Sequence, residues 1–106
     1  MYSIGFVMRV KPGQYDGYKE AHDNLWPEIA ASMSDHHVSM SIYLFEDLLF
    51  LHAVAPQEED WQRSREYPEL ERWSTYMSEF LESDEQGNVF FEQLPEAFAF
   101  GDFKSC

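Results

Sequence analysis

A change of hydrophobic periodicity early in the chain constrains the fold more than any other feature. Residues 2–10 alternate, with one side formed by Tyr2, Ile4, Phe6, Met8 and Val10. After "KPG" at 11–13, bulky side chains recur at three- and four-residue steps, at Tyr15, Tyr18, His22, Leu25, Ile29 and Met33. Alternation is typical of a strand with one buried side, and the longer period is typical of an amphipathic helix. The chain therefore begins with a strand that packs its apolar side against a helix.

Pro27 interrupts this helical stripe. Proline costs about 3 kcal/mol inside a helix but is tolerated in the first turn. We expect a kink or a restart near Trp26, with Glu28 in the first turn of the second piece.

The rest of the chain completes a βαββαβ order. Residues 36–45 and 48–55 are strand-like and are separated by Glu46 and Asp47, which predicts a tight hairpin. "PQEED" at 56–60 predicts a short helix holding Trp61, and Pro68 predicts a restart. The second helical stripe is Leu70, Trp73, Met77 and Phe80. A polar loop at 82–88 and a last strand at 95–100 would follow.

This order predicts a single α+β domain over residues 1–106, with a ferredoxin-like four-stranded antiparallel sheet. Helices on one face leave the other face of the sheet bare. Pairing with a second copy is the simplest way to cover it, which predicts a homodimer of the dimeric α/β-barrel type.

Composition excludes several classes of partner. Seven Lys and Arg against twenty Asp and Glu give a formal net charge of −13, which argues against nucleic acids and anionic membranes. No apolar run approaches the 18 residues of a transmembrane helix, and the N-terminus has no signal-peptide pattern. The single cysteine, Cys106, permits no internal disulfide. We expect a cytoplasmic protein, and the charge balance is compatible with a neutral small-molecule ligand.

Tyr18 and His22 are the first candidates for chemistry. They lie four residues apart, so their rings share one helix face, and Trp73 can approach the same space from the second helical region. Histidine titrates near pH 6.5 and can exchange a proton at neutral pH. Taken alone, however, a histidine on an apolar stripe is more often a hydrogen-bonded core residue than a catalyst. Spacing leaves both interpretations open.

Metal and nucleophile motifs are missing from the sequence. His36, His37 and His52 form no HxH or HExxH spacing, which argues against a zinc site. There is no GxSxG and no glycine-rich phosphate loop. We interpret Cys106 as a tail residue, not a nucleophile.

Several segments together resemble the L-rhamnose mutarotase family. They are "FVMRV", "YKEAHDNLWPE", "SIYLF", "LLF" and "RWSTYM", and the resemblance runs from Phe6 to about Phe98. The Y-x-x-x-H-x-x-x-W-P-E element is its specific part. The resemblance implies a cofactor-free homodimer of ferredoxin-like subunits that interconverts the α and β anomers of L-rhamnose. It also implies that His22 is the proton donor, that Tyr18 contacts the sugar and that Trp73 lines the pocket.

Two positions depart from the family pattern. Met40 stands where relatives often have a sugar-contacting tyrosine, and Ser74 replaces the second tryptophan of R-W-W. A related deoxyhexose or another aldose therefore stays open as the substrate. A cofactor-free monooxygenase of the dimeric α/β-barrel type and a non-catalytic ligand-binding module remain alternatives, because this architecture hosts many functions.

Overall fold

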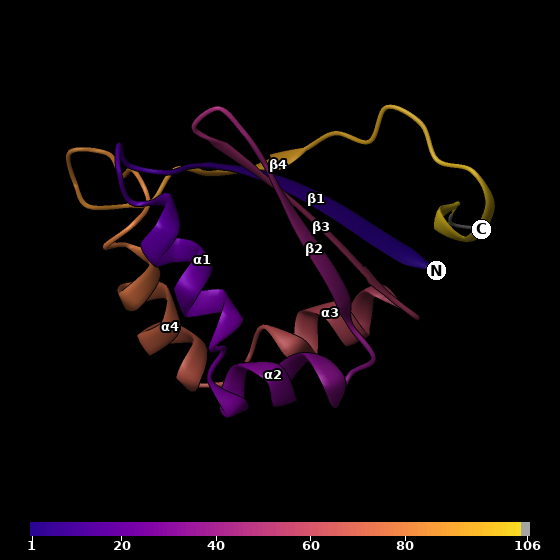
Figure 1. Ribbon diagram of the computed structural model, residues 1–106. Coiled ribbons are helices and arrows are strands. Elements are labelled where there is room, and N and C mark those ends of the chain that lie inside the picture. Colours follow the sequence, from indigo (N-terminus) through magenta and orange to yellow (C-terminus); the bar gives the residue numbers. More distant parts are fainter. Residues whose placement is uncertain (105–106) are drawn as a thin grey trace.

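Four strands and four α-helices alternate in the predicted order in the computed structural model, which describes residues 1–104 (Figure 1). Cys106 lies outside this range. The elements are β1 (Tyr2–Arg9), α1 (Tyr15–Asp23), α2 (Pro27–Ser34), β2 (Ser39–Phe45), β3 (Leu48–Ala55), α3 (Glu58–Ser64), α4 (Glu69–Met77) and β4 (Phe91–Leu94), followed by a 3₁₀ turn at Gly101–Phe103. The sheet is antiparallel in the order β2-β3-β1-β4, which confirms the α+β, ferredoxin-like arrangement.

The last strand is displaced from its predicted position. Alternation predicted it at 95–100, but β4 is Phe91–Leu94, with Leu94 opposite Gly5 on β1. Pro95 follows directly and has no N–H to continue the ladder. Phe91 instead fixes the strand, because its ring stacks on that of Phe6 with centroids 4.4 Å apart. The prediction at 95–100 was wrong, since alternation alone does not supply a partner strand.

The break between the first two helices follows from Pro27. The residue before a proline is driven out of the helical region, and Trp26 is extended at φ −60°, ψ 136°. Pro27 is then the first residue of α2, and Glu28 lies in its first turn. The predicted restart is confirmed.

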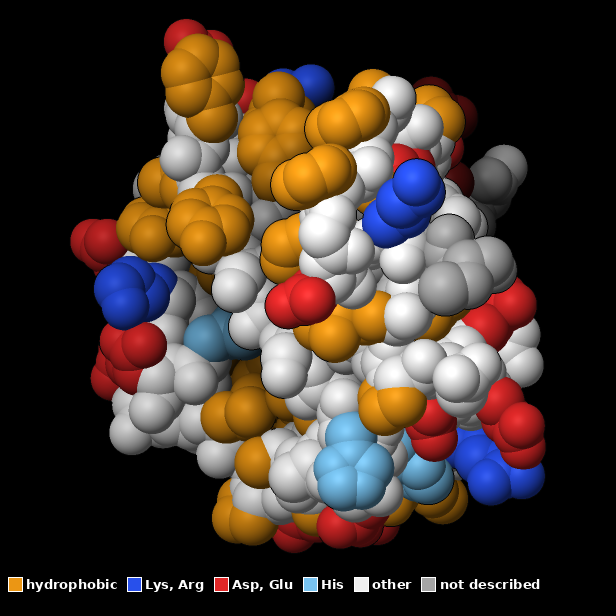
Figure 2. Space-filling view, turned by 90° about the vertical axis from the view of Figure 1, so that its right-hand side faces the viewer, with side chains coloured by type: hydrophobic (Ala, Val, Ile, Leu, Met, Phe, Trp, Pro, Cys, Tyr) orange, Lys and Arg blue, Asp and Glu red, His pale blue; other side chains and the backbone are white. Residues whose placement is uncertain are grey.

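All four helices lie on one side of the sheet (Figure 1). The strand side chains that face them are buried, among them Met8 on β1 and Leu49, Leu51 and Ala53 on β3. The opposite face carries no helix, and Tyr43 is 68% exposed there. From the side where the N-terminus lies, hydrophobic side chains gather on the upper half of the surface (Figure 2). The bare face agrees with the reasoning for a homodimer, which stays a prediction.

Candidate active site

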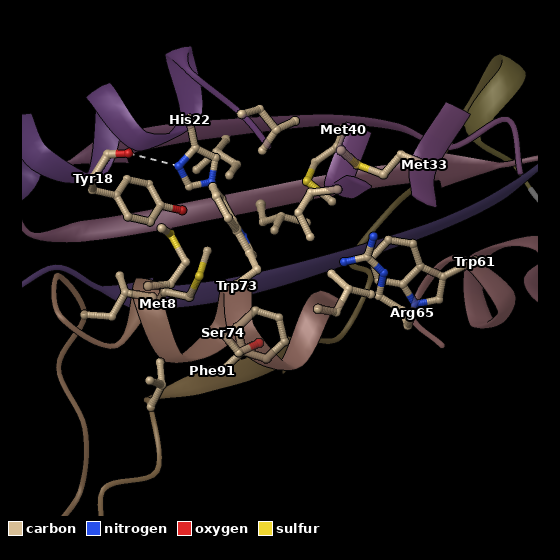
Figure 3. Close-up of a pocket in the computed structure, with 18 residues that line it drawn as sticks. Met8, Tyr18, His22, Met33, Met40, Trp61, Arg65, Trp73, Ser74 and Phe91 are labelled. Carbon is tan, nitrogen blue, oxygen red and sulfur yellow. Dashed lines mark hydrogen bonds between the residues drawn. The ribbon is translucent and has the colours of Figure 1, made fainter. Parts of the chain in front are cut away.

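A cavity of about 360 Å³ lies between the helices and the inner face of the sheet (Figure 3). Four of its lining side chains are polar: Tyr18, His22, Arg65 and Ser74. The others are apolar or aromatic, with Met33, Met40, Trp61 and Trp73 among them. A mostly apolar space with a few converging polar groups is typical of a small-molecule site.

His22 reaches the cavity with a fixed tautomer. Its Nδ1 lies 3.0 Å from the backbone oxygen of Tyr18, and a carbonyl oxygen can only accept a hydrogen bond. Nδ1 therefore carries the proton, and Nε2 holds a lone pair in the neutral ring. Burial lowers the pKa of His22 from 6.5, against smaller opposing effects of the Tyr18 carbonyl and Asp23. The neutral ring is the resting state at pH 7, with Nε2 as a base.

Tyr18 supplies a neutral phenol beside that imidazole. The two rings lie with centroids 4.3 Å apart, and Tyr18 is 5% exposed. Burial, together with nearby Tyr15, raises the pKa of the phenol. Its hydroxyl points into the cavity and has no hydrogen-bond partner among residues 1–104 (Figure 3). It is therefore free to bond to a ligand.

An aromatic cluster also packs against the His22 imidazole. Trp73 meets His22 edge-on, with centroids 5.3 Å apart, and meets Trp26 in the same way at 5.1 Å. Trp26 in turn stacks on Tyr76 at an interplanar angle of 3°. The break at Pro27 thus places the Trp26 ring where it supports Trp73, a role beyond that of a helix restart.

The three site residues predicted from the sequence come together in this cavity. Tyr18 and His22 reach it from α1 and Trp73 from α4. Met40 on β2 and Ser74 on α4 also line it, so both departures from the family pattern fall in the site. The roles of these side chains in binding and catalysis stay predictions.

The other three histidines, the consecutive His36 and His37 and the distant His52, do not line the cavity. His36 faces Tyr67, and His52 faces Phe103, at centroid distances of 5.9 and 5.2 Å. Within the described 104 residues, no group of three or more His, Cys, Asp or Glu is placed to hold a metal ion. Over the same residues, no helix has the length and apolar character needed to cross a bilayer.

Comparison with known proteins places the chain in a family. The family model for L-rhamnose mutarotase matches residues 3–100. The chain belongs to the L-rhamnose mutarotase family. Members of this family are isomerases, so the chain is an enzyme of that class.

Individual relatives agree over most of their length. The L-rhamnose mutarotase of Shouchella clausii is 32% identical over 87% of this chain and 91% of its own, and that of Klebsiella pneumoniae is 31% identical over 88% and 92%. The crystal structure of L-rhamnose mutarotase from Formosa agariphila superposes with a TM-score of 0.76 at 25% identity, covering 93% of this chain and 98% of that one. The mutarotase fold therefore extends over nearly the whole chain.

Arg65 and Trp61 also line the cavity, although the sequence patterns singled out neither as a site residue. Both come from the region of α3, for which the sequence predicts only a short helix holding Trp61. The available signal was their spacing, because residues four apart share a helix face. An arginine on the same face as a buried tryptophan points toward the interior.

The lowered pKa of His22 predicts the acid side of the pH profile. If neutral Nε2 is the base, kcat/KM should be flat between pH 7 and 8 and should fall as pH drops and Nε2 is protonated. The midpoint of that fall should lie below 6.5, because burial lowers the pKa of the imidazole. The measurement is the rate of anomer exchange from pH 4.5 to 8, corrected for buffer catalysis. A midpoint above 6.5, or no acid limb, would contradict the assignment.

Proposed function

We propose that this chain interconverts the α and β anomers of L-rhamnose or a related aldose, with His22 as the general acid and base. One observation carries the proposal: the Tyr18 carbonyl fixes the His22 tautomer, which leaves Nε2 free inside a sugar-sized, aromatic-lined cavity. Membership of the L-rhamnose mutarotase family supports the same reaction.

Ring opening removes a proton from the anomeric hydroxyl and delivers a proton to the ring oxygen. Neutral Nε2 of His22 takes the proton of the anomeric hydroxyl, and the O1 electrons form the C1=O1 bond as the bond from C1 to the ring oxygen breaks. The imidazolium then gives its proton to the ring oxygen. Both oxygens were attached to C1, so one ring nitrogen can serve them in turn. Closure on the other face of the aldehyde reverses these steps, and no net proton is gained or lost.

Tyr18 and Trp73 assist by positioning the sugar. The phenol of Tyr18 stays neutral and donates a hydrogen bond to a sugar oxygen, which stabilises negative charge that develops there. Trp73 offers its ring to the C–H face of the sugar and holds the imidazole against rotation. A positioned acid–base group contributes about 10²–10⁴-fold, which suffices for a reaction that already proceeds slowly in water.

Polarimetry tests the function. A freshly dissolved pure anomer of L-rhamnose should lose its excess rotation faster with the protein than without it, and a panel of aldoses ranks the substrates. Oxygen uptake with quinols or phenols tests the monooxygenase alternative in parallel. Oxygen uptake without any change in the mutarotation rate would replace the proposal, and sugar binding without a rate effect would favour the non-catalytic module.

We also propose that the chain works as a cytoplasmic homodimer. The bare outer face of the sheet includes Tyr43 and Phe45, which are 68% and 65% exposed. Contiguous exposed apolar surface is typical of interaction sites. Light scattering at micromolar concentration should give twice the 12.5 kDa chain mass. A monomer mass for the wild-type protein would contradict this.

A further inference from the structure

The Arg65 guanidinium stands out in the cavity because it is the one side chain among the lining residues that carries a permanent charge. None of those lining residues is an aspartate or a glutamate. The three ion pairs within residues 1–104 involve Arg9, Lys19 and Arg63, not Arg65. In a chain with twenty acidic residues, this cation has no protein counter-ion in the described part of the structure.

The guanidinium is held in place by residues at the end of α3. Its Nε donates to Ser64 Oγ at 3.2 Å, and Ser64 Oγ donates to the Trp61 carbonyl at 2.6 Å. The cation also lies over the Trp61 ring, with Cζ 4.7 Å from the centroid. Arg65 is the C-cap of α3 and follows Trp61 by four residues, so the last turn of the helix brings the two side chains together. One edge of the guanidinium is thus fixed, and the Nη atoms point away from the anchor.

The free edge is buried but unpaired. Nη2 of Arg65 is shielded from solvent and has no hydrogen-bond partner among the described residues. Burial lowers the pKa of Arg65, which reflects the cost of keeping the cation out of water. A buried charge without a partner is strongly unfavourable, so such groups are usually paired or bind a ligand.

We propose that Arg65 binds a carboxylate on the substrate, so that this chain favours an acidic aldose, a hexuronic acid, over the neutral sugar. A carboxylate matches the planar fork of a guanidinium and neutralises its charge, whereas a hydroxyl would satisfy the hydrogen bond alone. The inference rests on the proposed function, because it names the substrate class of the same site.

The cavity can hold one sugar ring between His22 and Arg65. Figure 3 shows Tyr18 and His22 at one end, Arg65 at the other and Trp73 between them. With the anomeric carbon and the ring oxygen at His22, C5 is the next ring atom beyond that oxygen, and its C6 substituent can extend along the cavity toward Arg65. A carboxylate at C6 is the acidic group of hexuronic acids.

The acidic surface of the chain does not oppose this assignment. All twenty acidic side chains lie outside the cavity lining. At physiological salt, exposed charges are screened over about 8 Å. Arg65 is therefore the permanently charged side chain that a ligand in the cavity meets directly.

Matched sugar pairs and matched variants test the inference. Anomer exchange is measured by saturation-transfer NMR for D-glucuronate against D-glucose, D-galacturonate against D-galactose and D-mannuronate against D-mannose, with L-rhamnose as the reference. The variants are Arg65→Met, which keeps the stem and loses the charge, and Arg63→Met as the control. Arg63→Met removes the same charge from α3, two residues before Arg65, but Arg63 is exposed and paired with Glu59.

In the wild type, at least one hexuronate should be exchanged faster than its neutral partner. Arg65→Met should lower the ratio of uronate to neutral-sugar kcat/KM by about 10- to 100-fold, as expected for a lost charge-assisted hydrogen bond. Arg63→Met should leave that ratio unchanged. Without ligand, Arg65→Met should melt at the wild-type temperature or above it, because an unpaired, half-buried charge has been removed.

The outcomes separate this inference from the proposed function. Exchange of L-rhamnose without a uronate preference, or a melting temperature that falls in Arg65→Met while the ratio stays constant, would overturn the role of Arg65 alone. If no sugar is exchanged, calorimetric titration with D-galacturonate decides. Binding that Arg65→Met weakens by 10-fold or more would keep the carboxylate site and overturn the mutarotase, and no binding would overturn both.

Discussion

Replacing His22 with alanine should lower kcat/KM for anomer exchange by about 10²–10⁴-fold, the usual contribution of a positioned acid–base group. The loss should appear in kcat, because the imidazole acts on the reacting oxygens and contributes little to ground-state binding. Polarimetry measures this loss directly, with the concentration of the variant raised until its slower exchange can be followed. Exogenous imidazole should restore part of the rate, since the alanine leaves room for it.

His52→Ala is the matched control for this variant. His52 is exposed on β3 and does not line the cavity, so its loss should leave the exchange rate at the wild-type value. Both variants should keep the wild-type circular dichroism spectrum. A His22→Ala protein that is folded and retains more than a tenth of wild-type activity would show that another group transfers the proton.

Truncating Trp73 to alanine should produce the largest loss of stability, about 3–5 kcal/mol, as for other buried tryptophans. Trp73 is 8% exposed and contacts the rings of His22, Trp26 and Tyr76, so the variant leaves a cavity that these neighbours cannot fill. The free energy of unfolding from urea titration measures the effect. Since domains of this kind are stable by only about 5–15 kcal/mol, much of the total would be lost.

Trp73→Phe separates packing from the specific indole. It keeps a ring edge toward His22 and should recover more than half of the lost free energy. If Trp73→Ala costs less than about 1 kcal/mol, below the range for buried tryptophans, the aromatic cluster is not the packed support described here.

Most of the fold follows from hydrophobic periodicity. Alternation located β1, the hairpin of β2 and β3 was bounded correctly by Glu46 and Asp47, and Pro27 marked the start of α2. The prediction of the last strand was wrong for a physical reason. Alternation at 95–100 is a local pattern, whereas the ladder on β1 ends where Pro95 lacks a donor.

The site was less accessible to sequence reasoning. Spacing put Tyr18 and His22 on one face but left His22 more often structural than catalytic, and only the family pattern favoured chemistry. Arg65 was missed, because its significance depends on what does not surround it. The absence of a carboxylate from the cavity lining around a half-buried guanidinium is a fact of three-dimensional packing, and no local window of sequence reports it.

The most direct test of the account is exchange of saturation between the two anomeric protons of L-rhamnose in the presence of the wild-type protein at pH 7. The account predicts that micromolar protein transfers saturation between the α and β signals and that the same concentration of His22→Ala does not. Anomeric signals that exchange no faster with wild-type protein than in buffer would contradict it.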